Sequence, residues 1–298
     1  MTKTPSVPDR VACFGAACID RTFRSIDEMR AGTSNPAVAE RGFGGVARNV
    51  AENLARLGVA VTLCSVVGDD EDGRSLVAHL RATGGDTSGV TVTREFATPQ
   101  YAAMIAPSGE LFAGAAEMRA IDSLRVDDLE HRRPQIDSAA WLFLDCNLPP
   151  SVIAACIVLR RSSRWRLAID AVSVAKAQRL PDDLSGVDLL FLNEEEARAC
   201  GGLDAIVRRG AKSVVLSRGP RGVLVGDLSI PALPAKPVDV TGAGDALVAG
   251  TLYGLLAGEP LEASVRVGLR LAARTVESTF SVRPDLSPAL LADATLLA

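Results

Sequence analysis

The residues best suited to chemistry lie in one heptapeptide, 239–245, with the sequence DVTGAGD. Small residues at Gly242, Ala243 and Gly244 allow the backbone to turn sharply and approach a ligand. An apolar stretch over 246–257 follows at once and predicts a helix whose first free N–H groups point at the same place. Those N–H groups and the positive end of the helix dipole suit a phosphate oxygen or the charge on a phosphoryl group in transfer.

The carboxylate of Asp245 closes this heptapeptide. A negative charge there would repel a bound phosphate, so we interpret Asp245 as the proton acceptor for an attacking hydroxyl group. Taken singly, each of these residues is more typical of a glycine-rich turn with a helix N-cap. The complete heptapeptide favours the catalytic interpretation.

A second glycine pair, Gly44 and Gly45, opens a predicted helix over 46–57, which Gly58 ends. The apolar residues of this helix recur at spacings of three and four. Asn49 lies in its second turn, close to the glycines. Ligand contact and an ordinary surface asparagine both remain open for this residue.

Short apolar runs alternate with helical stretches along the chain. A near-continuous apolar run over 11–19 predicts a buried strand that ends at Asp20. Further strands are expected at 61–67, 139–144, 167–169, 189–192 and 214–216. The alternation predicts an α/β fold in which a doubly wound, mostly parallel sheet has helices on both faces.

Polar residues follow the ends of these strands. In an open α/β sheet ligands bind beyond the carboxyl ends of the strands, so Asp20 is placed to meet a substrate, although a turn or cap residue is an equal alternative. We expect the polar residues at the other strand ends to gather at the same edge. These residues are Asp145, Asn147, Asp170, Asn193, Glu196 and Arg218.

Two of these segments suit a nucleotide and its metal ion. The carboxylate of Glu196, near the amide of Asn193, could hold hydrated Mg²⁺ through water. A helix start with acidic residues favoured by the dipole explains the same pattern. The loop 217–222, with the sequence SRGPRG, suits either a nucleotide phosphate tail or the entry to a hairpin.

Two segments are more polar than the rest of the chain and do not follow the alternation of strands and helices. Residues 21–43 are polar and contain a turn signal at 32–36, and residues 95–118 contain two extended stretches separated by a Pro-Ser-Gly turn. Together these segments predict a small sheet over one end of a single domain that spans 1–298.

The composition describes an ordinary globular chain of 298 residues with 48% apolar and 23% charged residues. A net charge of −4 without basic runs argues against nucleic acid as a partner. No segment has a signal-peptide core or the length to span a membrane, so we expect a cytoplasmic protein. Six scattered cysteines and two histidines favour reduced core thiols over a metal site or disulfides.

The two glycine motifs resemble the signatures of the ribokinase or PfkB-type sugar and nucleoside kinases over essentially the full chain. The resemblance implies a ribokinase-like fold, ATP and Mg²⁺ as cofactors, and a lid made by 21–43 and 95–118. It makes Asp245 the catalytic base and Gly242, Ala243 and Gly244 the anion hole. It assigns sugar hydroxyls to Asp20, Gly44, Gly45 and Asn49. It assigns Mg²⁺, through water, to Glu196, and the nucleotide to Asn193, Ser217, Arg218, Gly219, Gly222, Thr241 and Gly244.

Shorter motifs are most similar to the pseudouridine kinase branch of this family. They are the segments 33–36 (TSNP), 145–147 (DCN), 170–173 (DAVS) with Lys176, and 284–287 (PDLS). The likeness implies phosphorylation of a ribosyl 5′-hydroxyl group. Amides offer both a donor and an acceptor to a uracil edge, so Ser34, Asn35 and Asn147 are the candidates for recognising the base or its ribose.

Several alternatives stay open. A ribose-type sugar kinase or a purine nucleoside kinase would share both signatures, and a catalytically silent nucleoside or sugar sensor would share the fold. A dehydrogenase is less well supported, because no GxGxxG follows the first strand. The loop 278–281 lacks the glycine expected beside a monovalent cation, so we do not expect K⁺ activation. The lid belongs either to one chain or to an interlocked homodimer.

Overall fold

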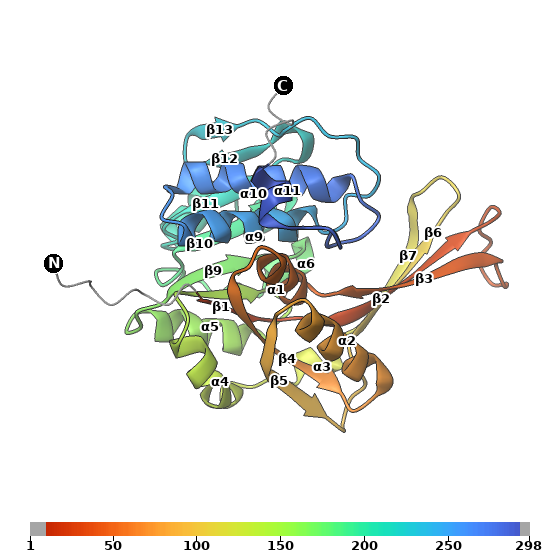
Figure 1. Cartoon of the computed structure of the whole chain (residues 1–298), viewed down its shortest axis with the longest axis horizontal. Coiled ribbons are helices and arrows are strands. Elements are labelled where there is room, and N and C mark those ends of the chain that lie inside the picture. Colours follow the sequence, from red (N-terminus) through yellow and green to blue (C-terminus); the bar gives the residue numbers. More distant parts are fainter. Residues whose placement is uncertain (1–9, 293–298) are drawn as a thin grey trace.

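The apolar runs pair into one large sheet. The computed structural model describes residues 10–292 and contains nine strands in the order β13-β12-β11-β10-β9-β8-β1-β4-β5. From β11 to β5 neighbouring strands are parallel, and β12 and β13 add an antiparallel hairpin at one edge (Figure 1). The strands are β1 (Arg10–Phe14), β4 (Ala60–Gly68), β5 (Asp86–Thr93), β8 (Trp141–Asp145), β9 (Arg166–Asp170), β10 (Leu189–Asn193), β11 (Val214–Ser217), β12 (Val223–Val225) and β13 (Leu228–Ile230).

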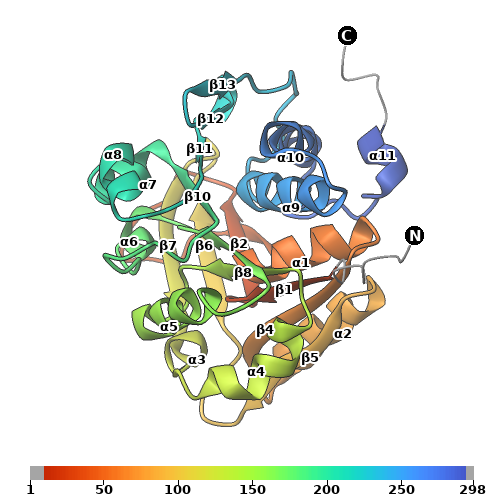
Figure 2. The ribbon, with the colours of Figure 1, turned by 90° about the vertical axis from the view of Figure 1, so that its left-hand side faces the viewer.

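Side chains that alternate along the buried strands separate two hydrophobic layers, one on each face of the sheet. Val11 and Cys13 of β1 pack in one layer, whereas Ala12 and Phe14 pack in the other. Figure 2 shows helices on both faces, which confirms the predicted doubly wound fold. The first layer includes α1 (Val46–Arg56), α2 (Glu71–Ala82), α9 (Ala243–Leu256), α10 (Leu261–Val276) and α11 (Pro288–Ala292). The second includes α3 (Arg119–Asp122), α4 (Asp128–Asp137), α5 (Pro150–Arg160), α6 (Val174–Ala177), α7 (Glu194–Ala199) and α8 (Leu203–Arg208).

A separate four-stranded sheet projects from one side of the large sheet (Figure 1). The strand order is β3-β2-β6-β7, with β2 paired antiparallel to β3 and parallel to β6. This small sheet brings together the two polar segments, 21–43 and 95–118. Its strands are β2 (Cys18–Ser25), β3 (Ala37–Gly44), β6 (Gln100–Ile105) and β7 (Leu111–Glu117).

The prediction of one strand over 11–19 is wrong. Strand β1 ends at Phe14, and Asp20 belongs to β2 of the small sheet. The break occurs at Gly15, where a Cβ atom would lie 2.3 Å from Oδ2 of Asp145. The N–H of Ala16 donates to the same oxygen at 2.9 Å. The Asp145 carboxylate thus ends the pairing of β1 and turns the chain into β2.

Two further differences from the sequence-based expectations lie at the edge of the large sheet and at the C-terminal end of the described residues. Strand β5 was not predicted, because as an edge strand it buries few side chains and lacks a strong apolar run. The sequence over 288–297 also predicts a final helix. The structure has α11 over Pro288–Ala292, and 293–297 lie outside the described residues. Between residues 10 and 292, no helix is both long and apolar enough to cross a membrane.

Candidate active site

The heptapeptide forms the start of helix α9, as predicted. Gly242 is the N-cap and adopts the left-handed conformation, with φ 80° and ψ −3°. The N–H of Thr241 donates to Oδ1 of Asp239 at 2.8 Å, which closes the turn before the helix. Among the residues described, no side chain caps the first turn of α9. The free N–H groups at this helix end can therefore receive an anion.

We expect Gly242→Ala to lower turnover at least about tenfold, because the first turn of α9 must move. A Cβ atom at Gly242 would lie 2.1 Å from the carbonyl oxygen of Ser281, in a backbone conformation that alanine rarely adopts. Gly258→Ala is a matched control, since Gly258 follows the other end of α9 with φ 85° and has nothing within 4 Å of the added atom. Steady-state rates and thermal melts of both variants test this. Equal turnover in the two variants would contradict the prediction.

Asp245 lies in the first turn of α9 and is buried, with 9% of its surface exposed. Its Oδ2 accepts a hydrogen bond of 2.7 Å from Nδ2 of Asn49, a residue 196 positions earlier in the chain. Burial raises the pKa of Asp245 to about 7, and the negative charges of Asp145 and Asp20 act in the same direction. The hydrogen bond from Asn49 opposes this shift. A carboxylate with a pKa near neutrality suits a general base.

The second glycine pair brings α1 and β2 to the same place. Gly45 is the N-cap of α1 with φ 94°, and a Cβ atom there would lie 2.4 Å from the carbonyl oxygen of Ala16. A Cβ atom at Gly44 would lie 2.2 Å from Oδ2 of Asp20. These close approaches require glycine and place Asp20 beside the start of the helix that carries Asn49. Burial raises the pKa of Asp20 as well.

Asp145, at the end of β8, connects these elements. Its Oδ2 accepts hydrogen bonds of 2.9 Å from the N–H groups of Ala16 and Ala47, and its Oδ1 accepts one of 2.9 Å from the N–H of Asn147. The side chain is fully buried, and burial raises its pKa. Asp145 therefore anchors the chain leaving β1 and the first turn of α1. It also fixes Asn147, which is buried beside it.

Two cavities lie near these residues. The smaller, of about 170 Å³, is lined by Asp245 and Gly244 together with Asp170, Asn193, Glu196 and Ser217. The larger, of about 610 Å³, lies between the small sheet, helix α1 and the segment 279–284, and its lining includes Asp20 and Thr241. Asp245 thus borders one cavity, and its electrostatic neighbour Asp20 borders the other.

The segment 193–196 starts a helix and also lines the smaller cavity, which is compatible with both interpretations of its sequence. Asn193 caps α7, and Glu196 Oε2 accepts a 2.8 Å hydrogen bond from the Asn193 N–H, which completes a capping box. Both residues nevertheless line the smaller cavity. Asp170, at the end of β9, lines it too, as expected for a polar residue at a strand end, although the sequence assigns it no ligand. Burial raises the pKa of Asp170 well above its usual range, and the charges of Asp245 and Glu196 add to the shift.

This carboxylate arrangement fits a hydrated cation better than a directly ligated one. Asp170, Glu196 and Asp245 all border the smaller cavity. Within 10–292, however, no three or more His, Cys, Asp or Glu side chains are grouped to hold a metal ion. Mg²⁺ keeps several of its waters when it binds together with phosphates. The residues present therefore fit an ion held through water and substrate oxygens.

Other predicted residues lie around or away from these cavities. Ser217 ends β11 in the smaller cavity, and a single 3₁₀ turn that begins at Gly219 and ends before Gly222 leads into β12. Arg218 closes this hairpin, because its N–H donates to the carbonyl of Gly222 and its side chain donates to Ser229 Oγ at 2.6 Å. The hairpin interpretation is thus realised in the structure.

Ser34 and Asn35 lie in the loop that joins β2 to β3, and they line neither cavity. Oδ1 of Asn35 accepts from the N–H of Arg30 at 2.8 Å, and its Nδ2 donates to the carbonyls of Arg30 and Thr33. The Asn35 amide therefore closes the loop. A role of these two residues in base recognition stays a prediction.

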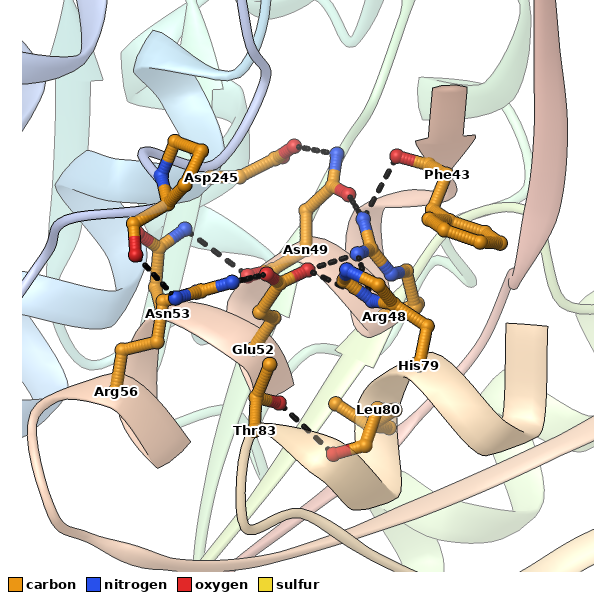
Figure 3. Close-up of polar contacts among 11 residues, drawn as sticks. Phe43, Arg48, Asn49, Glu52, Asn53, Arg56, His79, Leu80, Thr83 and Asp245 are labelled. Atoms are coloured by element: carbon orange, nitrogen blue, oxygen red, sulfur yellow. Dashed lines mark hydrogen bonds and ion pairs between the residues drawn. The ribbon is translucent and has the colours of Figure 1, made fainter. Parts of the chain in front are cut away.

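A buried ionic cluster next to Asn49 was missed by sequence reasoning (Figure 3). Arg48 and Glu52 of α1 form an ion pair in which each side chain is only 2% exposed. Arg56 and His79 approach Glu52 from either side, with shortest N···O distances of 2.7 Å and 3.8 Å. The sequence signal that could have indicated this cluster is the i,i+4 spacing of the opposite charges of Arg48 and Glu52 beside the apolar stripe of the helix.

The chain is similar to known kinases in both sequence and structure. The model of the pfkB family carbohydrate kinases matches residues 8–285. Pseudouridine kinase of Escherichia coli (strain K12) is 28% identical over 296 residues, which cover 94% of each chain. The structure of a carbohydrate kinase from Agrobacterium tumefaciens is 31% identical, with a TM-score of 0.84 and 96% coverage of both chains. Arabidopsis thaliana ribokinase complexed with ribose and ATP shares the fold, at a TM-score of 0.83 and 21% identity, covering 97% of this chain and 100% of its own. The chain belongs to the pfkB family of carbohydrate kinases.

Proposed function

We propose that this protein transfers the γ-phosphoryl group of ATP to the ribosyl 5′-hydroxyl of pseudouridine, giving pseudouridine 5′-phosphate and ADP. The carrying observation is the Asn49–Asp245 hydrogen bond at the uncapped start of α9, where Asp245 borders the smaller cavity. This arrangement supports a base and an anion hole for phosphoryl transfer. The preference for pseudouridine rests on the similarity to the Escherichia coli enzyme over 94% of both chains.

In this proposal the nucleoside occupies the larger cavity. Asp20, which lines this cavity, and the Gly44–Gly45 turn beside it hold the hydroxyl groups of the nucleoside. Asn147, whose N–H donates to Asp145, takes part in recognising the base or its ribose. Asp245 accepts the proton of the 5′-hydroxyl as its oxygen forms a bond to the γ-phosphorus in line with the breaking bond to the β–γ bridging oxygen. The N–H groups of Gly242 and Gly244 stabilise the transferring phosphoryl group, and ADP leaves. The N–H of Ala243 instead donates to the carbonyl oxygen of Val240 at 3.2 Å.

The phosphates of ATP enter the smaller cavity, with Asn193 and Ser217 near them and Gly219 and Gly222 along the rest of the nucleotide. Thr241 borders the larger cavity, and we place it at the end of the phosphate chain nearest the nucleoside. Bound Mg²⁺ would neutralise charge on the phosphate oxygens. Glu196 and Asp170 would hold that ion through its water molecules, which also relieves the repulsion between their buried carboxylates. Because ATP is the donor, we assign the reaction to the cytoplasm.

We also propose that segments 21–43 and 95–118 act as the lid of a single 1–298 domain and that the lid pairs with a second copy. Phe23 and Met104 are exposed and lie opposite one another in the register of β2 and β6. Ala39 and Ala113 extend this apolar face on the neighbouring strands. A sedimentation experiment that finds a monomer at all concentrations would exclude the homodimer.

A substrate panel tests the proposed function. Pseudouridine, uridine, adenosine, inosine, ribose and fructose are each offered with ATP and Mg²⁺, and ADP release is measured. We expect pseudouridine to give the highest kcat/KM and replacement of Na⁺ by K⁺ to have no effect. A higher kcat/KM for ribose or a purine nucleoside would assign a different acceptor within the same family. Absence of ligand-dependent ADP release would instead identify a nucleoside or sugar sensor.

A further inference from the structure

Arg48 makes contacts that determine how Asn49 is oriented (Figure 3). Nη1 of Arg48 donates to Oδ1 of Asn49 and to the carbonyl oxygen of Phe43, both at 2.7 Å. Its Nη2 pairs with Glu52 on the next turn of the helix. The guanidinium carbon lies 5.5 Å from the centre of the Phe43 ring. Arg48 is thus held on several sides at a fixed position.

The amide of Asn49 can face its two neighbours in one orientation only. With Oδ1 accepting from Arg48, Nδ2 is directed at Oδ2 of Asp245. Exchanging the two ends would set the amide N–H₂ against a guanidinium that cannot accept and the oxygen against a carboxylate that cannot donate. We propose that Arg48 is a positioning residue that keeps Asn49 a hydrogen-bond donor to Asp245. This inference rests on the proposed role of Asp245 as the catalytic base.

Stability alone does not explain why an arginine is buried here. A buried ion pair loses hydration, and replacing it by apolar side chains is often neutral or stabilising. Burial lowers the pKa of Arg48 to about 10, so its side chain remains charged at neutral pH. The cation therefore stays next to Asn49 at a desolvation cost, which a role in orienting the amide accounts for.

The charges around Asp245 strengthen this role. The groups that interact with it are Asp20 from β2, Asp145 from β8, Asp170 from β9 and Arg48 from α1. Arg48 alone among these four is cationic. Its charge and the hydrogen bond that it enforces both favour the ionised form of Asp245. Loss of Arg48 should therefore raise the pKa of the base as well as loosen its position.

A double-mutant cycle tests the inference at pH 8.5, with the substrate on which the wild-type protein is most active. We expect Arg48→Met to lower kcat about tenfold, with the KM for ATP changed less than about twofold, as expected for a misplaced catalytic group. In the Asn49→Ala background the same substitution should lower kcat less than about twofold, because Arg48 then has no amide to orient. An equal reduction in both backgrounds, or an unchanged kcat, overturns the proposal.

The pH profile gives a second readout that a structural role would not move. In Arg48→Met the acidic limb of kcat/KM should shift to higher pH, and a limb that stays at the wild-type position also overturns the proposal. If Arg48→Met does not fold, Arg48→Lys carries the same cycle. Its single ammonium keeps the charge beside Glu52 but cannot reproduce the forked contacts. Wild-type kcat in Arg48→Lys would show that the fork is not needed and reject the inference.

Arg132→Met is the matched control. Arg132 is also 2% exposed, and its guanidinium carbon lies 5.3 Å from the ring centre of Phe14, but it donates to Ser65 and Thr91 and not to Asn49. We expect a lower melting temperature with kcat unchanged. A tenfold loss of kcat there would mean that any buried arginine has this effect, which contradicts a specific role for Arg48. Failure of the proposed function is recognised separately, as absence of substrate-dependent ADP release by the wild-type protein.

Discussion

Asp245→Asn is expected to reduce turnover by about 10²–10⁴-fold while leaving the fold intact. The amide has the same shape as the carboxylate, but it cannot accept the proton of the acceptor hydroxyl. Its oxygen can still accept the hydrogen bond from Asn49 that Asp245 accepts at 2.7 Å. Because burial raises the pKa of Asp245, the charged side chain destabilises the folded state near pH 8, and the neutral amide should melt at the same or a higher temperature.

Asp188→Asn is a control in which we expect the reverse: a loss of stability without a loss of turnover. The Asp188 side chain is 12% exposed, pairs with Arg160 at 2.6 Å and lines neither cavity. Removing its charge should lower the melting temperature and leave turnover nearly unchanged. Single-turnover ADP formation and thermal melts of both variants distinguish these outcomes. Substantial turnover by Asp245→Asn would remove this residue from the role of base.

The pH dependence of kcat/KM should report the ionisation of Asp245. With a pKa of about 7, the base is ionised above neutrality and protonated below it. We expect a plateau above pH 8 and a fall of about tenfold per unit below pH 7, so that activity at pH 5 is about 100-fold lower. The burial of Asp245 and the nearby charges of Asp145 and Asp20 account for this acidic limb.

Folding stability follows the opposite trend for this group, which separates loss of the base from unfolding. Between the unfolded value near 3.8 and the folded value of about 7, the folded state binds more protons at Asp245 than the unfolded state does. The contribution of Asp245 to the free energy of unfolding therefore increases as pH falls through this window. Circular dichroism at each pH, and recovery of activity on return to pH 8, check that the fold persists. A flat kcat/KM between pH 5.5 and 8 would contradict a pKa of about 7 for Asp245.

Local patterns predicted the elements that present the site. The glycine-rich heptapeptide and its apolar continuation became the start of α9, and the Gly44–Gly45 pair became the start of α1. Both predictions succeeded because a turn and the helix after it are encoded within about fifteen neighbouring residues. The strand over 11–19 failed for the opposite reason. Its interruption at Gly15 is caused by Asp145, which is 130 positions away and invisible to a local pattern.

The amino-acid sequence by itself determined the alternation of strands and helices along most of the chain, the two glycine turns and the carboxylate at the start of α9, because each depends on the spacing of near neighbours. Tertiary structure decided which side chains meet. It placed Asn49 between Arg48 and Asp245, and it brought Asp170 and Glu196 to one cavity. It also set the pKa of the base, since burial and the charges of distant residues govern proton affinity. These properties arise only when separate segments are packed together and water is excluded from between them.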